Sequence, residues 1–548
     1  MTASTPPKLA GTVAEAFARS AARFASNDWL QVLPETAGVY GIDARTWTYA
    51  EADREVRRLR LIYANAGYGH GHRAGLMLGN RPDFLLHWFA LNGLGVSVVP
   101  VNADWRSAEL EYLVAHSEIA LAVCLPERAA DLADAARAAG RNVAITGPAS
   151  QPLPLAPVPA PLADRAPDAS SECALLYTSG TTGRPKGCIL PNEYFLWAGA
   201  WYAGLGGLCD IRAGRERMLT PLPLTHMNAM ACSVTCMLLT GGCLILLDRF
   251  HPRSWWQSVR AARATIVHYL GVMPAMLLTA PQSRDDRDHG VRFGFGAGVN
   301  PRHHAVFEAR FGFPLVEGWA MTETGTGGIV MANHEPRHVG TGCFGRAEPA
   351  VEWRIVDDAG SDVAPGMAGE LLVRRAGVRP RFGFFAGYFK DEAATREAWA
   401  DGWFHSGDLV TRDGNGDLRF VDRKKNVIRR SGENISAVEV EGVLAQHPAV
   451  RAAGVTAVPD DLRGDEVFAC VVPEDNALAG EGLAREICAF VRERLAYYKA
   501  PGFLAFCASL PLTPTEKIQR SNLKDLARRS LDEATCFDLR ALKRRSDA

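Results

Sequence analysis

Apolar runs alternate with mixed polar and apolar stretches along the first 145 residues of the chain. Residues 12–24 space their apolar side chains along one face of a helix, and residues 83–94 predict a second helix. The continuous apolar runs 73–78, 96–101 and 120–124 are typical of strands that are buried on both faces of a sheet. Helices that alternate with buried strands predict an α/β fold of layered sheets and helices.

A second α/β series follows a connection, residues 148–167, that is rich in Pro and Ala and cannot hold a helix. The strands expected in this series are residues 174–177, 243–247, 265–269 and 292–296. Gly, Pro and alternating strands at residues 341–418 predict a smaller β-rich subdomain. Beyond the charged junction 422–425, a compact α/β module of ordinary domain size is expected, with helices 436–446 and 483–495 and strands 452–458 and 466–472.

Composition and charge exclude several classes of function. The formal net charge of -1 gives no electrostatic reason to expect nucleic acid or an anionic membrane as a partner. The apolar stretch 229–247 is interrupted by Gly241-Gly242, which predicts a helix and a buried strand rather than a membrane span. Twelve Cys without a C-x-x-C pair predict buried free thiols in a reducing cytoplasm, and no zinc site. The basic run Lys543-Arg-Arg545 is expected to be a solvated terminus.

A run of small, hydroxylated residues follows the expected strand 174–177. The segment Thr178-Ser-Gly-Thr-Thr-Gly-Arg-Pro-Lys-Gly187 contains four hydroxyl side chains, flexible glycines and two cations. Glycines let backbone N–H groups approach phosphate oxygens, and hydroxyl and lysine side chains add donors. The segment is not a Walker loop, because Pro185 stands where that motif requires Gly and Gly187 where it requires Ser or Thr. A phosphate loop is therefore the hypothesis, and a surface turn is its alternative.

Two later segments place carboxylates where a nucleotide could use them. Glu323 ends the segment Glu317-Gly-Trp-Ala-Met-Thr-Glu323, and a carboxylate is a ligand that a hard cation on phosphate prefers. Asp408 ends the segment Trp403-Phe-His-Ser-Gly-Asp408, where a tight turn is expected. As an acceptor-only group, Asp408 could bind two hydroxyl groups at once. Taken alone, the Thr-Glu pair is equally well interpreted as a helix cap.

With Asp422-Arg-Lys-Lys425 and Leu512-Thr-Pro-Thr-Glu-Lys-Ile-Gln-Arg520, these segments follow one another in an order that resembles a known group of enzymes. The chain is similar to the adenylate-forming superfamily of acyl-CoA synthetases, luciferases and peptide-synthetase adenylation domains. The resemblance spans essentially the whole chain. It implies a large N-terminal domain, residues 1–422, that binds ATP and the acid. It also implies a small mobile C-terminal domain, residues 423–548, that carries the catalytic lysine.

The resemblance implies a role for each segment. The loop with Lys186 would grip the β- and γ-phosphates of ATP, Trp319 would stack on adenine, and Glu323 would ligate Mg²⁺. Lys517 would stabilise the adenylation transition state, although Glu516 replaces the usual Gly beside it. Lys425 would be the hinge. The cofactor-binding residues expected on this basis are Thr178, Ser179, Gly180, Thr181, Thr182, Gly183, Lys186, Gly296, Ala297, Gly298, Trp319, Asp408 and Arg423 at the ribose, and Gly432 near a thiol tunnel. The expected catalytic residues are Lys517, Thr322 at the α-phosphate, Glu323 and His226.

The acid is expected to bind near His226, Asn228, Met230 and the glycine-rich turn 296–298, where backbone can approach ligand closely. His226 matches a family position that borders the reacting carboxylate, and a core His is the alternative. A dense aromatic group, Tyr194, Phe195, Trp197, Trp201 and Tyr202, lies on an expected helix. Core packing is the favoured interpretation of this group, and an acyl-pocket wall or a cage for a cationic substrate is the alternative.

The expected activity is that of an ATP-dependent carboxylic acid:CoA ligase. Such an enzyme forms an acyl-adenylate and pyrophosphate, then an acyl-CoA thioester and AMP, with Mg²⁺ as metal. Residues 223–228 lack an Asp that would hold an ammonium group, which disfavours amino-acid activation. Other adenylate-forming activities and a non-catalytic nucleotide-binding relative stay open. The motifs at residues 430–434 and 513–520 look most like the bacterial crotonobetaine/carnitine-CoA ligase branch. A homodimer is compatible with the sequence, which does not identify the acid.

Overall fold

The computed structural model describes residues 11–149, 152–158, 165–178, 184–357, 359–423, 428–435, 437–475, 479–511, 518 and 520–543. The chain divides into two compact units. The first comprises Met1–Ala103, Val114–Leu176 and Gly187–Asp422, and the second comprises Asp104–Leu113, Tyr177–Lys186 and Arg423–Ala548. The longest segment of the small unit thus begins at Arg423. The functional division into a domain that binds ATP and acid and a mobile domain stays a prediction.

An eight-stranded sheet in the first unit has the order β14-β13-β12-β11-β9-β10-β1-β2. Its inner neighbours pair in parallel, and the edge strands β14 and β2 pair antiparallel. The strands are β1 (Asp28–Gln31), β2 (Thr46–Thr48), β9 (Arg217–Thr220), β10 (Cys243–Leu246), β11 (Ile266–Leu270), β12 (Phe293–Ala297), β13 (Leu315–Trp319) and β14 (Val330–Met331). The runs 243–247, 265–269 and 292–296, which were expected to be strands, form the parallel strands β10, β11 and β12, and most of their side chains are buried.

A seven-stranded sheet has the order β18-β8-β7-β4-β3-β5-β6. Its strands are β3 (Arg73–Met77), β4 (Ser97–Pro100), β5 (Leu121–Cys124), β6 (Ala144–Thr146), β7 (Glu172–Thr178), β8 (Lys186–Pro191) and β18 (Gly387–Tyr388). The strands predicted at residues 73–78, 96–101 and 120–124 are therefore confirmed as β3, β4 and β5. Strand β18 arrives from much later in the chain and pairs antiparallel with β8.

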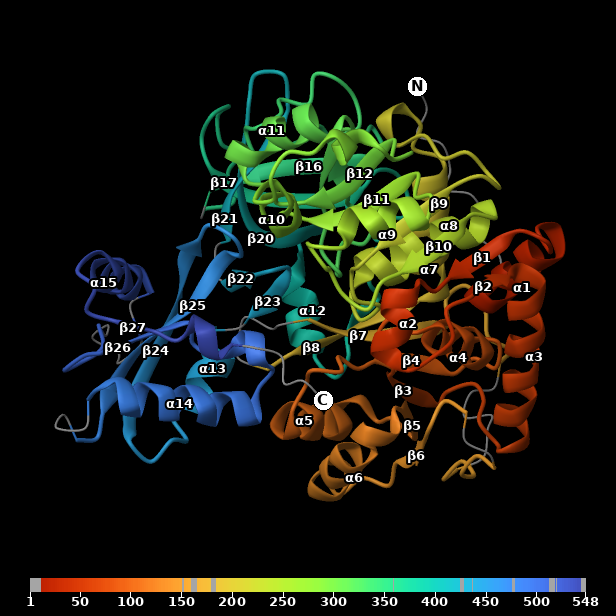
Figure 1. The fold of residues 1–548 in the computed structure, drawn as a ribbon, viewed down its shortest axis with the longest axis horizontal. Helices are drawn as coiled ribbons and strands as arrows, with labels where there is room; N and C mark the ends of the chain where they lie inside the picture. The colour runs from red at the N-terminus through yellow and green to blue at the C-terminus, as the bar shows by residue number, and fades with distance from the viewer. Residues whose placement is uncertain are drawn as a thin grey trace. The chain divides into compact units, whose positions relative to one another are not determined.

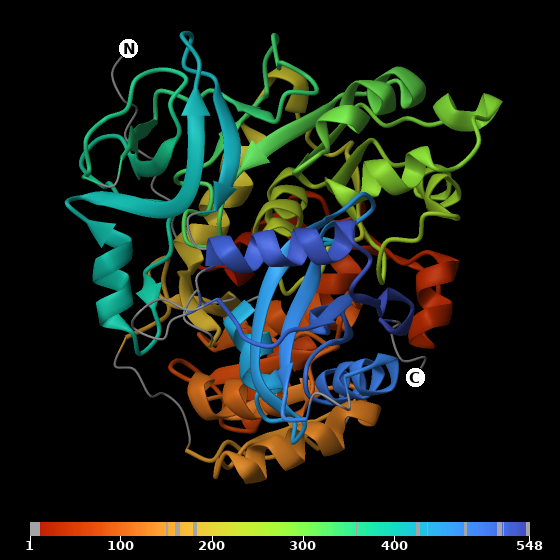
Figure 2. The same cartoon turned by 90° about the vertical axis from the view of Figure 1, so that its left-hand side faces the viewer.

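The predicted β-rich subdomain is an antiparallel sheet of the order β15-β21-β20-β17-β16, with β19 paired to β20. Its strands are β15 (Cys343–Gly345), β16 (Val351–Val356), β17 (Gly369–Arg375), β19 (Trp399–Ala400), β20 (Trp403–Arg412) and β21 (Leu418–Arg423). Figure 2 shows the long strands β20 and β21 side by side. This sheet carries Asp408 in the middle of β20.

The helices of this part of the chain begin and end at residues with known preferences. The Thr12 hydroxyl and the Glu15 carboxylate form a capping box at the start of α1, and Gly241 in the left-handed region ends α8. Helix α1 packs on α3, α4, α7 and α8 (Figure 1). The helices are α1 (Val13–Arg23), α2 (Pro34–Tyr40), α3 (Tyr49–Asn65), α4 (Pro82–Asn92), α5 (Ser107–Ser117), α6 (Ala129–Ala138), α7 (Asn192–Ala203), α8 (Val234–Thr240), α9 (Trp255–Ala261), α10 (Val272–Leu278), α11 (Pro301–Phe311) and α12 (Glu392–Ala398).

The second unit has a sheet of the order β23-β22-β25-β26-β27, with β24 also paired to β25. Successive side chains of a strand point to opposite faces, and β25 uses this to serve two cores. Val467, Ala469 and Val471 pack with α13 and α14, while Phe468 and Cys470 pack with α15. The elements are β22 (Ile428–Arg430), β23 (Glu433–Ile435), α13 (Ala437–Leu444), β24 (Val450–Asp460), β25 (Gly464–Pro473), α14 (Glu481–Arg494), β26 (Phe503–Phe506), α15 (Arg520–Asp532) and β27 (Phe537–Asp538).

All twelve cysteines are free thiols, ten of them buried, as their spacing predicted. The apolar stretch 229–247 folds into a π-helical turn (Asn228–Ser233), α8 and β10, which confirms a helix followed by a buried strand. Within the described residues, no helix has the length and apolar character that would let it traverse a bilayer. The π-helical turn at the start of this stretch was not predicted.

Candidate active site

The predicted phosphate loop connects two neighbouring strands of the seven-stranded sheet. Thr178 ends β7 and Lys186 begins β8, and both residues are half-buried. The two side chains therefore stand at the two ends of one strand connection. Ser179, Gly180, Thr181, Thr182 and Gly183 lie outside the described residues, so the phosphate-binding geometry of the loop stays a prediction.

The Glu323 side chain is held by a tyrosine that lies 65 residues further along the chain. The Tyr388 hydroxyl donates a hydrogen bond to Glu323 Oε1 over 3.0 Å, and Glu323 is buried. Burial and the nearby Glu323 charge raise the pKa of Tyr388 well above its ordinary value, so the phenol keeps its proton and stays a donor. Tyr388 pairs with Cys188 in β8, two residues after Lys186. The carboxylate is thus fixed to the strand that begins at the phosphate loop.

The turn around Thr322 is braced from helix α7. The Tyr194 hydroxyl donates to the Thr322 carbonyl oxygen over 2.9 Å. A Cβ added at Gly325 would lie 2.4 Å from both the Gly383 carbonyl oxygen and the Tyr194 ring, so only Gly fits between them. The aromatic group on α7 is buried, and its members pack on Phe195, Phe382 and Phe295. Core packing, the favoured interpretation of this group, is confirmed.

Trp319 and Asp408 contact each other directly. The indole Nε1–H donates to Asp408 Oδ2 over 2.9 Å, and the indole ring stacks on Phe344 with centroids 6.2 Å apart. Asp408 is fully buried. The two residues come from different sheets, β13 and β20, so this contact could not be read from the sequence. Where Tyr is common in the resembling family, Trp adds a ring N–H donor to the carboxylate.

The expectation of a tight turn before Asp408 is wrong, because residues 406–408 form a bulge inside the ten-residue strand β20. Leu372 pairs with His405 and Glu370 with Leu409, so residues 406–408 stand opposite the single residue 371. The Ser406 hydroxyl donates to the Leu371 carbonyl oxygen over 2.6 Å and accepts from the Asp408 N–H over 3.1 Å. A bulge re-aims side chains without ending the strand, and that is how Asp408 reaches Trp319.

Gly296, Ala297 and Gly298 lie at the carboxyl end of β12, next to the parallel strand β13 that carries Trp319. Ligands bind preferentially at such strand ends. The buried carboxylate of Glu317 accepts from the N–H groups of Gly298 (3.0 Å) and Val299 (3.1 Å) and from the Tyr269 hydroxyl (2.9 Å). Sequence analysis missed Glu317 as a site residue. Its position two residues before Trp319, on the same face of a strand, was the available signal.

The segment expected to border the acid enters the π-helical turn (Asn228–Ser233). His226 is half-buried and its carbonyl oxygen accepts from the Met230 N–H over 3.0 Å, while Met230 itself is fully buried. Asn228 Oδ1 lies 2.6 Å from His268 Nδ1, and the Tyr202 hydroxyl lies 3.0 Å from His268 Nε2. Burial lowers the pKa of His268 to about 3, so the ring is neutral. Sequence analysis missed His268, which lies in the middle of the buried strand β11.

The bonds around His268 set its tautomer. Asn228 Oδ1 can only accept, so His268 Nδ1 carries the proton and Nε2 accepts from the Tyr202 hydroxyl. The Ser233 hydroxyl also lies 2.9 Å from Nδ1, and it donates its own proton to the Asn228 carbonyl oxygen over 3.3 Å. Burial raises the pKa of Tyr202 well above its ordinary value, which keeps that hydroxyl protonated. The result is a neutral, fully oriented polar network behind His226. π-Helical turns occur frequently at functional sites, and this one orients Asn228.

Four further expected residues belong to the second unit. Arg423 ends β21, and its side chain lies outside the described residues, as do Lys425 and Lys517. Gly432 has a φ of +87° and follows Ser431 at +50°, in the turn between β22 and β23. Two successive left-handed residues make a sharp turn, for which Gly is suited and Ser is strained.

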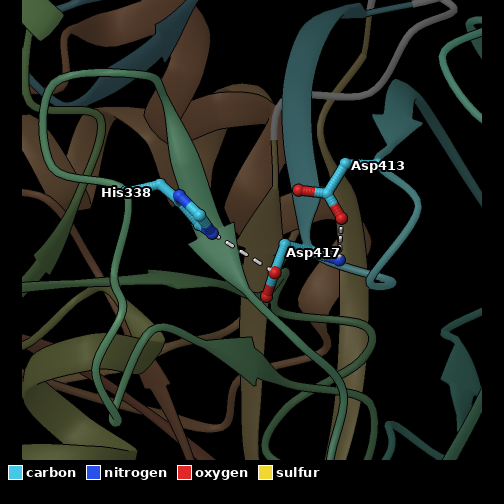
Figure 3. A group of neighbouring side chains, drawn as sticks. All are labelled: His338, Asp413 and Asp417. Atoms are coloured by element: carbon cyan, nitrogen blue, oxygen red, sulfur yellow. Dashed lines mark hydrogen bonds and ion pairs between the residues drawn. The ribbon is translucent and has the colours of Figure 1, made fainter.

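A separate group, His338, Asp413 and Asp417, gathers at the turn between β20 and β21 (Figure 3). Its candidate ligand atoms lie within 4.8 Å of one another. Arg419 pairs with Asp413 over 3.1 Å and Arg346 pairs with Asp417 over 3.0 Å. Both carboxylates already face a cation, so we interpret the group as an ion-pair network that braces the hairpin. The ion pairs of Asp413 and Asp417 involve Arg419 and Arg346, neither of which is a predicted site residue.

Comparison with known proteins agrees with this geometry. Residues 26–388 match the family model "AMP-binding enzyme", and residues 439–517 match "AMP-binding enzyme C-terminal domain". Sulfoacetate–CoA ligase of Cupriavidus necator is 32% identical over 533 residues, covering 95% of this chain and 99% of that protein. Crotonobetaine/carnitine–CoA ligase of Shigella flexneri is 30% identical over 494 residues, covering 87% of this chain and 93% of that protein.

Solved structures give the same result. The amide bond synthetase McbA from Marinactinospora thermotolerans superposes with a TM-score of 0.77 at 26% identity, covering 93% of this chain and 99% of that one. A malonyl-CoA ligase with methylmalonyl-CoA and AMP bound gives a TM-score of 0.72 at 25% identity, covering 89% of this chain and 97% of that one. The chain therefore belongs to the AMP-binding enzyme family of the adenylate-forming superfamily and is an acid:CoA ligase.

Proposed function

We propose that this ligase activates a short carboxylic acid that carries a second, hydrogen-bond-accepting polar or anionic group. The observation that carries the proposal is the neutral network of Asn228, His268 and Tyr202. Because Oδ1 of Asn228 faces His268, the amide NH₂ of the same side chain is directed elsewhere and is a donor. A donor of this kind favours a carboxylate or sulfonate over a quaternary ammonium group. One of the two relatives named above supports the proposal, since sulfoacetate carries a sulfonate beside its carboxylate, whereas crotonobetaine and carnitine, the substrates in the name of the other, carry a quaternary ammonium group.

In the first step, a carboxylate oxygen of the acid attacks the α-phosphorus of ATP and pyrophosphate leaves. We assign the grip on the β- and γ-phosphates to Lys186 and residues 178–183, and the contact with the α-phosphate to Thr322. Trp319 would stack on adenine, and Asp408 with Arg423 would bind the ribose. Lys517 would stabilise the charge that develops between phosphate and carboxylate. Its position, like that of Lys425 at the hinge, rests on the sequence.

Glu323 suits a magnesium ion. Its carboxylate is oriented by the Tyr388 phenol, which is a neutral donor and leaves the negative charge in place for a cation. When bound, Mg²⁺ would neutralise charge on the ATP phosphates. In the second step, the CoA thiol attacks the acyl carbon and AMP leaves, and we place the Ser431–Gly432 turn beside the thiol path. We also propose a cytoplasmic location, which the twelve free thiols support.

The substrate proposal is tested with a panel of acids in the presence of Mg-ATP and CoA. Short acids with a second anionic group should exceed unsubstituted and quaternary-ammonium acids by about tenfold or more in kcat/KM. Asn228→Ala should lower kcat/KM for the preferred acid by about tenfold through loss of one hydrogen bond to a charged group, with the KM for ATP unchanged. Asn65→Ala, on an exposed residue of α3, is the matched control. A preference for a cationic or plain aliphatic acid would contradict the proposal.

The assignment of Lys517 is tested by separating the two half-reactions. Lys517→Ala should slow acid-dependent pyrophosphate release by about 10²-fold, the scale of one preorganised donor to a transition state. Thioester formation from a supplied acyl-adenylate should be largely retained, because the small domain is expected to rotate between the two steps and take Lys517 away from the reacting atoms. Rapid-quench measurements of each half-reaction check both statements. Equal losses in the two would show that Lys517 has another role.

A further inference from the structure

The chain beyond α15 returns to the sheet of the second unit instead of extending into solvent. Strand β27 pairs with β26, with Phe537 opposite Leu504. The Leu539 N–H then donates to the Gly502 carbonyl oxygen over 2.8 Å, and the Leu539 side chain is buried in the core. A 3₁₀ turn (Arg540–Leu542) directs the next residue inward. We call this segment, Phe537–Lys543, the C-terminal strap.

Lys543 ends the strap with a fully buried side chain, so the expectation of a solvated basic terminus is wrong for this residue. Its Nζ contacts Glu466 Oε1, and the Glu466 side chain is fully buried as well. Arg430 Nε lies 2.9 Å and 2.8 Å from the two oxygens of the same carboxylate, with only 2% of its side chain exposed. One buried carboxylate therefore holds two buried basic side chains that lie more than a hundred residues apart in the sequence. Lys543 is buried because of its position in the chain. It follows the strand β27, which pairs with β26, and this pairing holds the residues after it against the sheet.

Glu466 has little freedom to move. Its Oε1 also accepts from the Val467 N–H over 2.9 Å. A Cβ added at Gly502 would lie 2.4 Å from both Cγ and Cδ of Glu466, so the absence of a side chain at residue 502 creates the space that the glutamate occupies. Gly502 is also the residue whose carbonyl oxygen binds the strap at Leu539. The strap and the carboxylate are thus fixed at the same point of the sheet.

Arg430 transmits this arrangement to the turn that we assign to the second half-reaction. It is the last residue of β22 and directly precedes Ser431 and Gly432, which have φ values of +50° and +87°. Its backbone pairs with Gly464, and the Ser431 N–H donates to the Arg463 carbonyl oxygen over 2.9 Å. A non-glycine residue with positive φ is strained and persists only when its surroundings hold it. The Arg430 side chain, anchored by Glu466, is part of those surroundings.

We propose that Lys543 is a positioning residue for thioester formation, acting through Glu466 and Arg430 on the Ser431–Gly432 turn. The proposal rests on the proposed role of that turn beside the thiol path. Without Lys543, the Glu466 carboxylate would keep its bonds to Arg430, and the buried space left beside it would let the pair move. The turn would then lose its fixed conformation while the adenylation residues of the first unit stay as they are. The strap lies beyond residue 517, where the match to the family's C-terminal domain ends.

The test uses Lys543→Met in the full chain, because Met keeps most of the aliphatic stem and removes Nζ. Thioester formation from a supplied acyl-adenylate and CoA should fall by about tenfold, as for loss of a charge-assisted hydrogen bond, while pyrophosphate release stays within about twofold. Backbone amides of residues 429–433 should exchange hydrogen faster than in the wild type. Arg528→Met, at an exposed position of α15, is the matched control and should change none of these.

A second variant covers the case in which Lys543→Met does not fold. Gly502→Ala pushes against Glu466 from the other side and should reproduce the selective loss of thioester formation. Unchanged thioester formation in a folded variant, or equal losses in both half-reactions, would overturn the proposal. Failure of the proposed function has a different signature, because the wild-type enzyme itself would then form acyl-adenylate without thioester. Hydrogen exchange at residues 429–433 reports on the strap in either case.

Discussion

At the scale of single residues, the nucleotide site depends on one indole. The Trp319 side chain makes two contacts. Its ring stacks on Phe344, and its N–H donates a hydrogen bond to Asp408 over 2.9 Å. Asp408 is fully buried, and a buried carboxylate is stable as an anion only when donors face it. The indole N–H is such a donor. A tyrosine ring at the same position would carry its donor at a different place, so the Trp is coupled to the bulge that sets Asp408.

Trp319→Phe should therefore weaken ATP binding. The ring that would stack on adenine is kept, but the carboxylate loses a donor worth about 1.5–3 kcal/mol when the acceptor is charged. We expect the KM for ATP to rise by about tenfold, with the acid preference unchanged. Titration with a non-hydrolysable ATP analogue measures the effect directly. Trp353→Phe, in β16 of the sheet that carries Asp408, is the control, and an equal loss of affinity in both variants would contradict a specific role for the Trp319 N–H.

At the scale of elements, two neighbouring parallel strands bring the proposed acid-binding turn and the proposed adenine-stacking residue to one edge of a sheet. Strand β12 ends in the turn 296–298, and β13 carries Glu317 and Trp319 beside it. Glu317 ties the two strands together by accepting from Gly298 and Val299. Burial raises the pKa of Glu317 despite these donors. The turn is thus held by a side chain of the adjacent strand and not by its own sequence.

Two glycines of this turn should respond differently to substitution. A Cβ at Gly298 meets no heavy atom within 4 Å, although its φ of +78° is strained for other residues. Gly298→Leu should fold at a cost of about 1–2 kcal/mol and narrow the range of accepted acids before it changes ATP affinity. A Cβ at Gly296 would lie 2.2 Å from the Tyr269 carbonyl oxygen, so Gly296→Ala should destabilise the fold instead. The acid panel and urea unfolding separate the two, and an unchanged acid ranking for Gly298→Leu would place the acid elsewhere.

The local pattern of polar and apolar residues predicts a strand or helix correctly where the segment's own residues decide how deeply it is buried. The runs that became β3, β5, β10 and β25 were recognisable because parallel or central strands are apolar throughout. The bulge at residues 406–408 was missed because it is defined by register with β17, and a strand's partner is not written in its own sequence. His268 and Glu317 were missed for a related reason. Each is a polar residue in an apolar strand whose bonding partners come from distant elements.

At the scale of the whole molecule, the chain folds into two units with separate cores. The small unit is closed by its own last described residues, through a buried group formed by the Glu466 carboxylate, the Arg430 guanidinium and the Lys543 amine. Such a group is expensive to bury, since desolvation offsets much of the attraction between the charges. Its retention at this point is consistent with a role in fixing conformation, and it makes the stability of the small unit depend on the ionisation of Lys543.

The pH dependence follows from the sign of the Lys543 shift. Burial, followed by the positive charge of Arg430, lowers the pKa of Lys543 from 10.5 to about 7. Between pH 7 and pH 10.5 the unfolded chain binds a proton at this lysine that the folded chain has released, so stability rises with pH across this window. Below pH 7 both states are protonated and the folded unit carries the full cost of the buried charge.

Lys543→Met lacks this titrating group and therefore its contribution to the pH dependence of stability. The difference in free energy of unfolding between wild type and Lys543→Met, measured with urea, should shift in favour of the wild type by about 2 kcal/mol from pH 7 to pH 9. Taking the difference removes the titrations that the two proteins share. Parallel curves over this range would show that Lys543 keeps an ordinary pKa and that the strap closes the unit without burying a titrating charge.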